Sequence, residues 1–192
     1  MRRTILIILL LLTPPAATIA LSSWIEQSRY PRRFAEVVPG RIYRGGFPSV
    51  QEVRHLRGEK SIRAIVSLTG PTDRENERAM LSEAQRLGIT LLRFPMPGDG
   101  RGDYEMIDRA AEAVAKEANW PVYFHCAAGK QRSNAVLAAY RLKYCGWSVD
   151  EVRRELVDQH GLDVSDPKEA QLWQHIKDYA GRLETETAAK KE

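Results

Sequence analysis

Residues 121–144 read PVYFHCAAGKQRSNAVLAAYRLKY, and they contain a strand pattern, a loop and a helix pattern in direct succession. The stretch opens with a short apolar run, Val122 to His125, which is typical of a buried strand. The loop HCAAGKQRS (125–133) follows, and the pattern after Ser133 is that of a helix. A strand that leads directly into a helix places the loop between them at the carboxyl edge of a sheet, where open α/β folds bind ligands.

The rest of the chain alternates strand and helix patterns as far as this loop. Strands are predicted over 41–44, 64–68, 90–94 and 122–125, and helices over 49–57, 73–87 and 103–118. Beyond the loop the pattern is helical only, over 130–144, 148–159 and 166 to about 183. Pairs of the capping-box type, Ser49 with Glu52 and Ser148 with Glu151, mark two of the helix starts. We therefore expect an α/β fold with a largely parallel central sheet of four to five strands flanked by helices, and an all-helical C-terminal part.

Length and composition indicate one globular domain. The chain has 192 residues, of which 43% are hydrophobic and 28% charged, as in ordinary soluble domains. We place the domain at 37–183, after a linker at 21–36 that becomes an arm packed on it, and before a disordered tail at 184–192. The net charge of +4 falls to +2 without residues 1–20, and no block of basic residues is present, so a nucleic-acid partner is not expected. The sequence indicates no particular oligomeric state.

The first twenty residues have the pattern of an export signal. Arg2 and Arg3 precede an uninterrupted apolar run at 5–12, and Thr13-Pro14-Pro15 and the small residues AATIA follow. A signal peptide cleaved after Ala20 and an uncleaved membrane anchor both fit, and a cytoplasmic protein with an apolar N-terminus is the third alternative. We expect a protein that is exported to the periplasm or secreted, or anchored to the membrane, through contact of this segment with the export machinery or the bilayer.

The two cysteines, Cys126 and Cys145, would suggest a disulfide in an oxidising compartment. The surroundings of Cys126 instead indicate a free thiolate, so no disulfide is predicted. The four histidines form no HxxxH pair and the cysteines no CxxC pair, so no metal site and no cofactor are expected.

The loop after the strand has the composition of a phosphate cradle. Small residues at 127–129 let the backbone curl so that several N–H groups point inward, and the following helix adds its positive end. Arg132 can clamp a phosphate through two parallel hydrogen bonds. The same donors favour a thiolate at Cys126. We expect a nucleophile at Cys126 and a phosphate-binding loop, the latter formed by Ala127, Ala128, Gly129, Lys130, Gln131 and Arg132.

Two further residues of the loop have expected roles beside the nucleophile. The hydroxyl of Ser133 can hydrogen-bond the thiolate and help it leave when the phosphocysteine is hydrolysed. His125 is expected to be buried and to brace the loop through hydrogen bonds rather than to act as a base.

These residues resemble a known family. HCAAGKQRS is similar to the HCx5R[ST] loop of the cysteine-dependent protein tyrosine and dual-specificity phosphatases. VVPGRIYRGGFPS (37–49) and AIVSL (64–68) resemble the N-terminal part of the small atypical dual-specificity-like phosphatases of bacteria, plants and fungi. The resemblance covers roughly 37–182 and implies a dual-specificity-phosphatase-like fold and a phosphocysteine intermediate. One departure is Asn134, where many relatives have glycine or alanine.

The chemistry of this family implies a proton-shuttling carboxyl group on a movable loop. The glycine-rich stretch FPMPGDGRGDYE (94–105) is the expected place. Asp99, between two glycines, is the preferred general acid. Asp103 is the alternative, although it could simply be the N-cap of the next helix, and neither residue serving is the third possibility. Arg101 in the same loop contacts substrate or is solvated.

The substrate class is open between two groups. Gly129-Lys130 resembles the GK of phosphoinositide and inositol-phosphate phosphatases, in which an extra cation meets extra phosphates. The alanines at 127 and 128 keep the loop's charge modest, which favours phosphotyrosine, and possibly phosphoserine or phosphothreonine, in proteins. We expect a phosphatase for phosphoprotein, with an inositol-phosphate or phosphoinositide phosphatase as the alternative. A non-catalytic phosphate-binding module is the alternative of another class, which would have no need of the thiol.

Overall fold

The computed structural model describes residues 29–189, and the sheet within them has five strands. These are β1 (Ala35–Val38), β2 (Ile42–Gly45), β3 (Ala64–Ser67), β4 (Thr90–Arg93) and β5 (Val122–His125). Their order is β1-β2-β5-β3-β4. The pairs β2–β5, β5–β3 and β3–β4 are parallel, and only β1 pairs antiparallel. The predicted α/β class with a largely parallel sheet is confirmed.

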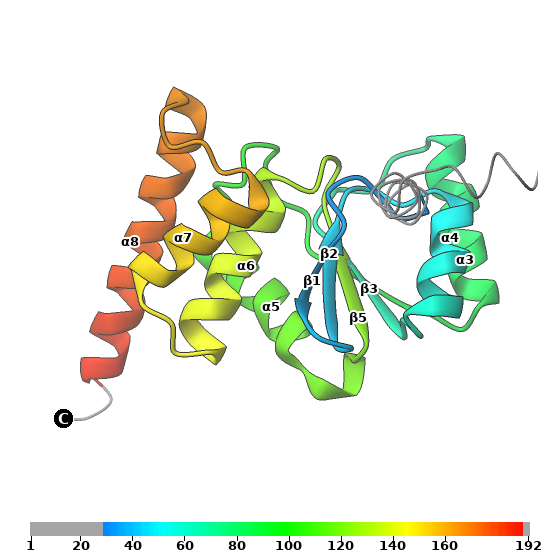
Figure 1. Ribbon diagram of the computed structural model, residues 1–192, viewed down its shortest axis with the longest axis horizontal. Coiled ribbons are helices and arrows are strands. Elements are labelled where there is room, and N and C mark those ends of the chain that lie inside the picture. Colours follow the sequence, from blue (N-terminus) through cyan, green and yellow to red (C-terminus); the bar gives the residue numbers. More distant parts are fainter. Residues whose placement is uncertain (1–28, 190–192) are drawn as a thin grey trace, which may run out of the picture. The chain divides into compact units, whose positions relative to one another are not determined.

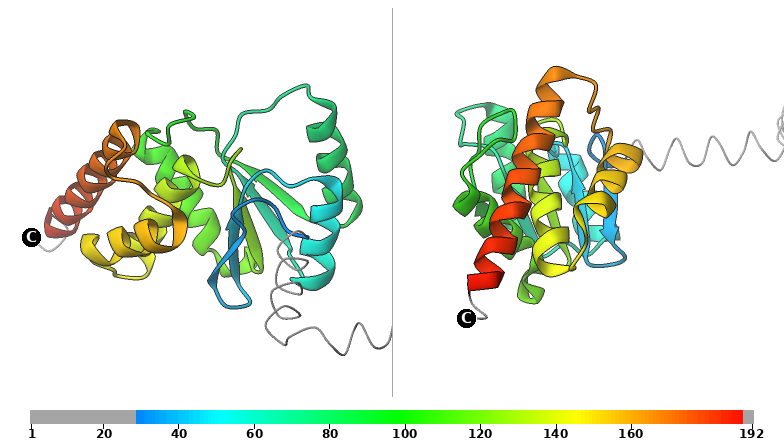
Figure 2. Two further views of the ribbon diagram at one scale, coloured as in Figure 1. Left: turned by 45° about the horizontal axis from the view of Figure 1, so that its top comes forward. Right: turned by 90° about the vertical axis from the view of Figure 1, so that its left-hand side faces the viewer.

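Helices cover both faces of this sheet (Figure 1). α3 and α4 contact each other on one side, while α5 and α6 pack on β5 on the other side. α7 and α8 then pack on α6, so that α8 lies beyond α6 from the sheet in the left view of Figure 2. The helices are α3 (Val50–Glu59), α4 (Glu75–Arg86), α5 (Tyr104–Ala115), α6 (Gln131–Tyr144), α7 (Val149–His160) and α8 (Pro167–Ala189), with a short 3-10 turn, η1 (Glu117–Asn119).

The helix boundaries follow from local capping chemistry. Ser49 and Ser148 each accept a hydrogen bond from the backbone of the glutamate three residues later, which completes the two predicted capping boxes. Gly161 ends α7 in the left-handed region, with φ of 66°, where a residue without Cβ costs least. Local capping residues therefore place three helix boundaries, the starts of α3 and α7 and the end of α7.

The core lies between the sheet and α6. Every residue of β3 and β5 is buried, as is the run from Ser133 to Arg141 in α6. α6 is buried because α5, α7 and α8 surround it. A helix that is buried on all sides does not need a polar face. The loop between β5 and α6 is thus held between two rigid, buried elements.

The structure differs from the sequence prediction at both ends of the domain. The predicted arm at 21–36 contains the start of β1, and the compact unit begins at Pro31 rather than at 37. Residues 184–189, predicted as disordered tail, continue α8. The predicted signal or anchor at 1–20 lies outside the described residues. Within residues 29–189 no helix has the length and hydropathy that a membrane span requires.

Candidate active site

The loop at 126–130 is formed where three parallel strands end together. Gly45 and Ser67 are in register with His125, so β2, β3 and β5 finish at one edge of the sheet. Gly129 has φ of 70°, and a Cβ there would lie 2.5 Å from the carbonyl carbon of Gly45. Only glycine fits this close approach, and it lets the loop turn back against the end of β2.

Cys126 lies at the floor of the loop, with 2% of its surface exposed. The Gly129 N–H donates to its Sγ at 3.2 Å. Burial alone would raise the pKa of the thiol. The Ser133 hydroxyl, the amides of Ser133 and Lys130, and the charge of Arg132 outweigh burial and lower the pKa below its ordinary value. The Cys126 sulfur therefore lies among several hydrogen-bond donors and one positive charge.

Ser133 and His125 flank the cysteine and are both fully buried. Within residues 29–189, Ser133 Oγ makes no hydrogen bond of standard geometry, so its proton can be directed at the neighbouring sulfur. His125 Nδ1 lies 3.1 Å from the carbonyl oxygen of Cys126. Burial lowers the pKa of His125 to about 4, so the imidazole is neutral near pH 7. The neutral imidazole of His125 is therefore placed to hydrogen-bond the backbone of the loop at Cys126.

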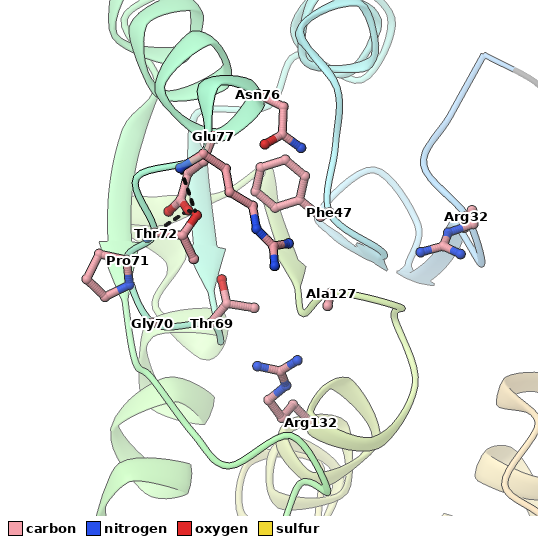
Figure 3. Close-up of a pocket in the computed structure, with 11 residues that line it drawn as sticks. Arg32, Phe47, Thr69, Gly70, Pro71, Thr72, Asn76, Glu77, Ala127 and Arg132 are labelled. Atoms are coloured by element: carbon pink, nitrogen blue, oxygen red, sulfur yellow. Dashed lines mark hydrogen bonds between the residues drawn. The ribbon is translucent and has the colours of Figure 1, made fainter.

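Arg132 points from the start of α6 into a cavity of about 530 Å³ beside the loop (Figure 3). Its Nη1 lies 3.4 Å from the Leu68 carbonyl oxygen. Ala127 also lines the cavity, so the cavity opens directly onto the loop. The other lining residues are Arg32, Phe47, Thr69, Gly70, Pro71, Thr72, Arg74, Asn76 and Glu77.

One wall of this cavity, the segment 69–74 between β3 and α4, is fixed by an ion pair between a half-buried arginine and a buried glutamate. Arg93 Nη2 lies 2.8 Å from Glu77 Oε1, and Arg93 Nη1 donates to the Thr69 carbonyl at 3.0 Å. The other oxygen of Glu77 accepts from the amide of Thr72 at 2.9 Å and also from its hydroxyl. These bonds outweigh the effect of burial and lower the pKa of Glu77. The charge of Glu77 is neutralised by Arg93. The cavity is therefore positively charged, because three other arginines line it: Arg32, Arg74 and Arg132.

Lys130 and Gln131 are directed away from the cavity, toward α8. Lys130 Nζ forms an ion pair with the buried carboxylate of Glu169, and Gln131 Nε2 lies 3.5 Å from the same carboxylate. Neither side chain lines the cavity. The side chains of Lys130 and Gln131 are therefore not placed to contact a ligand in this cavity.

The two candidate acids differ in their surroundings. Asp103 is the N-cap of α5 and accepts from the Glu105 amide at 2.8 Å. Asp99 accepts from the amide and the Nε of Arg101, both at 3.0 Å, and these contacts lower its pKa. A Cβ on the adjacent Gly100 would lie 2.7 Å from the Gln131 carbonyl carbon, so the Asp99 loop lies against the start of α6. Asp99 therefore lies on a segment that contacts the start of α6, next to the loop that carries Cys126. The carboxylate of Asp103 instead caps the N-terminus of α5.

The structure also places residues at the site that the sequence does not single out. Arg44 on β2 is buried behind the loop, while Arg32 and Arg74 line the cavity. Arginines in a chain with 29 basic residues carry no local signal of this kind. Both cysteines are free thiols, with Cys145 exposed. Among residues 29–189 no cluster of three metal-ligating side chains occurs.

Known proteins resemble this chain in sequence and in fold. The profile of the tyrosine phosphatase family matches residues 30–190. The inositol diphosphatase SIW14 of Saccharomyces cerevisiae is 29% identical over 153 residues, which are 72% of this chain and 53% of the yeast protein. The inositol diphosphatase DSP2 of Oryza sativa is 32% identical over 143 residues, 69% of this chain and 67% of the rice protein. The chain thus spans about half the length of the yeast relative.

A solved structure shares the fold. The core catalytic domain of the PP-IP phosphatase SIW14 from S. cerevisiae superimposes with a TM-score of 0.67 and 24% identity, over 84% of this chain and 94% of that domain. The family profile extends over β1 to α8, which includes the loop with Cys126 and Arg132. The chain therefore belongs to the tyrosine phosphatase family, and it is an enzyme of the cysteine-dependent phosphatase class.

Proposed function

We propose that this phosphatase removes the terminal phosphate of a diphosphate group on an inositol polyphosphate, with Cys126 as the nucleophile. Both curated relatives described above carry the name inositol diphosphatase. Their similarity supports the inositol-phosphate alternative over the phosphoprotein substrate that the sequence alone favours. Because the chain spans only part of these relatives, its substrate is a proposal in its own right.

The positive charge of the cavity is the observation that carries this proposal. One phosphate monoester is clamped by the loop amides and a single guanidinium, the role proposed for Arg132. The same cavity is lined by Arg32 and Arg74, while its carboxylate, Glu77, is already paired with Arg93. Two further guanidinium groups suit a substrate with several phosphates. The alanines at 127 and 128 indicate a modest charge for the loop alone. They do not reflect the positive charge that Arg32 and Arg74 add to the cavity from other parts of the chain.

The leaving group offers a second argument. Asp99 is held ionised by Arg101, whereas a general acid must carry a proton. A tyrosine oxygen has an ordinary pKa near about 10, so its departure needs a proton. A phosphate leaving group has its second pKa near about 6, so it departs as an anion with little help. The site as observed is better suited to a phosphoanhydride than to an ester.

The reaction then proceeds in two displacements. The Cys126 thiolate attacks the terminal phosphorus, a P–S bond forms, and the bridging P–O bond breaks as the inositol phosphate leaves with the electron pair. Water next attacks the phosphocysteine, the P–S bond breaks, and the sulfur leaves as a thiolate stabilised by the Ser133 hydroxyl. The proton lost by water passes to Asp99 or to solvent. The loop amides and Arg132 bind the transferring phosphoryl group in both steps.

A substrate panel with the full chain tests this proposal. We expect kcat/KM for a diphosphoinositol pentakisphosphate to exceed that for a phosphotyrosine peptide at least tenfold. Arg32→Ala and Arg74→Ala should each raise KM for the inositol substrate about tenfold, a loss of roughly 1.4 kcal/mol, and change KM for p-nitrophenyl phosphate much less. Arg78→Ala, an exposed arginine one helical turn along α4 from the position of Arg74, is the matched control. Preference for the peptide would overturn the proposal.

We also propose that residues 1–20 direct export or anchor the chain to a membrane. The support is the pair Arg2 and Arg3 ahead of the apolar run at 5–12. N-terminal sequencing of the protein recovered from cell fractions tests this. A chain that starts near residue 21 outside the cytoplasm indicates a cleaved signal, an intact chain in the membrane fraction indicates an anchor, and an intact chain in the cytoplasm would contradict the proposal.

A further inference from the structure

Arg44, on β2, forms hydrogen bonds to the phosphate-binding loop and to the start of α6. Its side chain is fully buried. Its Nη2 donates to the Gly129 carbonyl oxygen at 3.0 Å and to Asn134 Oδ1 at 2.7 Å. One amino group of the guanidinium therefore joins the turn of the loop to the first turn of α6.

This burial is costly for a charged group. Within residues 29–189 Arg44 forms no ion pair with a carboxylate at salt-bridge distance, and its Nε and Nη1 have no hydrogen-bond partner. Burial lowers the pKa of Arg44 to about 10, so the guanidinium still carries its charge near pH 7. A buried cation without a paired carboxylate destabilises a fold unless another anion compensates it. Among the anions that favour its charged form, the thiolate of Cys126 has the largest effect on the pKa of Arg44, ahead of Glu155.

The peptide that Arg44 holds has its other end in the active site. The Gly129 carbonyl and the Lys130 N–H belong to one planar trans peptide, in which the two groups point in opposite directions. With the carbonyl turned outward to Arg44, the Lys130 N–H is turned inward, where it stabilises the sulfur of Cys126. Without the hydrogen bond from Arg44 the peptide could rotate, because Gly129 permits many backbone conformations.

We propose that Arg44, with Asn134 as its second anchor, is a positioning residue that keeps the Gly129–Lys130 peptide oriented with its N–H toward Cys126. Asn134, in the first turn of α6, supplies the acceptor that fixes Nη2. The inference rests on the proposed role of Cys126 as nucleophile, but not on the identity of the substrate.

The ionisable groups around Cys126 come from three elements. Arg44 lies on β2, and Arg132 on α6. Tyr123 and His125 lie on β5. Burial raises the pKa of Tyr123 well above its ordinary value and lowers that of His125 to about 4. Arg33 also faces the loop, because its Nη1 donates to the Ala128 carbonyl oxygen at 2.9 Å. Tyr123 and His125 are uncharged between pH 5 and 9, so among the described residues around the loop ionisation of the thiol dominates the pH dependence of Cys126 reactivity in that range.

Alkylation of Cys126 tests the inference without any turnover. The full chain carrying Cys145→Ser, which removes the exposed thiol, is treated with iodoacetamide at a series of pH values, and modification of Cys126 is followed by mass spectrometry. We expect Arg44→Met to move the inflection of the rate upward by at least one pH unit, which is a tenfold loss of thiolate below the inflection. Asn134→Ala should move it in the same direction by less.

Arg141→Met is the matched control, because Arg141 is a buried arginine of α6 that pairs with Glu155 and lies outside the loop. It should lower thermal stability and leave the inflection in place. Folded Arg44→Met with an unchanged inflection overturns the inference, and so does an equal shift in Arg141→Met. If Arg44→Met does not fold, Asn134→Ala decides, and its unchanged inflection overturns the inference. Failure to hydrolyse inositol diphosphates would contradict the proposed function and leave this result intact.

Discussion

Arg101 donates a hydrogen bond to each of the two carboxylate oxygens of Asp99. The Arg101 amide donates to Oδ1 at 3.0 Å, and the guanidinium donates to Oδ2 at 3.0 Å through Nε. The hydrogen bond from the amide is the largest of the effects that lower the pKa of Asp99. The carboxyl group that the sequence favours as general acid is therefore deprotonated near pH 7 in the structure, which constrains the leaving groups that the enzyme can release quickly.

Removing Asp99 should consequently have little effect on an anhydride substrate. We expect Asp99→Asn to change kcat for a diphosphoinositol pentakisphosphate less than about threefold, because the leaving phosphate needs little protonation. Turnover of an alkyl phosphate depends on proton donation, because its leaving alcohol has a high pKa. If Asp99 is the proton donor, this turnover should fall about a hundredfold in the variant. Steady-state kinetics on both substrates measures the contrast. A large and equal loss on both would show that Asp99 acts through binding or loop structure instead.

Cys126→Ser separates chemistry from binding. Loss of the nucleophile should reduce turnover by at least about a thousandfold, in line with other nucleophile removals. Inorganic phosphate should still bind to the variant, as tightly or more tightly, because a neutral hydroxyl replaces the thiolate beside the dianion. Isothermal titration with phosphate measures this. Near-normal turnover in the variant would exclude the covalent mechanism.

Arg132→Lys tests whether the guanidinium acts as a two-pronged clamp. Lysine keeps the charge but cannot form two parallel hydrogen bonds to one phosphate. We expect phosphate affinity and kcat/KM each to fall at least tenfold, with the thermal midpoint changed by a few degrees at most. Full activity in Arg132→Lys would show that charge alone suffices at this position.

Lys130 Nζ pairs with a carboxylate and does not line the cavity, whereas the GK pair suggests a rim cation. Its ion pair with the buried Glu169 joins the start of α6 to the first turn of α8. Lys130→Ala should lower the free energy of unfolding by roughly 1–2 kcal/mol, since one partner of a half-buried pair is lost. KM for the inositol substrate should stay within twofold, because the loop amide is retained. Urea unfolding and kinetics measure the two effects, with exposed Lys168→Ala as the control. A tenfold rise in KM would restore Lys130 as a substrate contact.

The sequence predicts the parts of this fold that local patterns determine. Ser49 and Ser148 mark helix starts through capping boxes, and the apolar run before Cys126 marks the strand that carries the loop. β1 has no such signal, because a four-residue edge strand such as Ala35–Val38 owes its pairing to the neighbouring β2. The polar sequence at 184–189 is helical as an extension of α8. Its alternating Glu and Thr residues give no apolar periodicity by which to predict it.

The active-site loop is predictable for the same reason, whereas its surroundings are not. Cys126, Gly129 and Arg132 stand within seven residues, and the strand pattern before them and the helix pattern after them make this spacing a prediction of a phosphate cradle. Arg44 is 85 positions from Gly129, and only the pairing of β2 with β5 brings it behind the loop. Such contacts depend on tertiary structure, so a strand arginine cannot be distinguished by sequence from one that faces solvent.

Glu83 on α4 makes the stability of the domain dependent on acid pH. Its carboxylate accepts from Arg86 Nη2 at 2.6 Å and from Arg54 Nε at 2.7 Å. These bonds, with that to Arg86 first, lower its pKa from 4.5 to about 2. A carboxyl group with a lower pKa in the folded than in the unfolded state stabilises the fold above its unfolded pKa. That contribution should be lost progressively as the pH falls from about 4.5 to 2.

Glu83→Gln tests this dependence, because glutamine mimics the protonated carboxyl group. The variant should be less stable than the natural protein at pH 7, and the difference in free energy of unfolding between the two should shrink steadily below pH 4.5. Urea unfolding followed by circular dichroism at pH 7, 5, 4 and 3 measures it. Glu112→Gln, on an exposed glutamate of α5, should show no comparable convergence. A difference that stays constant from pH 7 to 3 would mean that the two arginines do not depend on the charge of Glu83, and that this contact stabilises α4 by hydrogen-bond geometry alone.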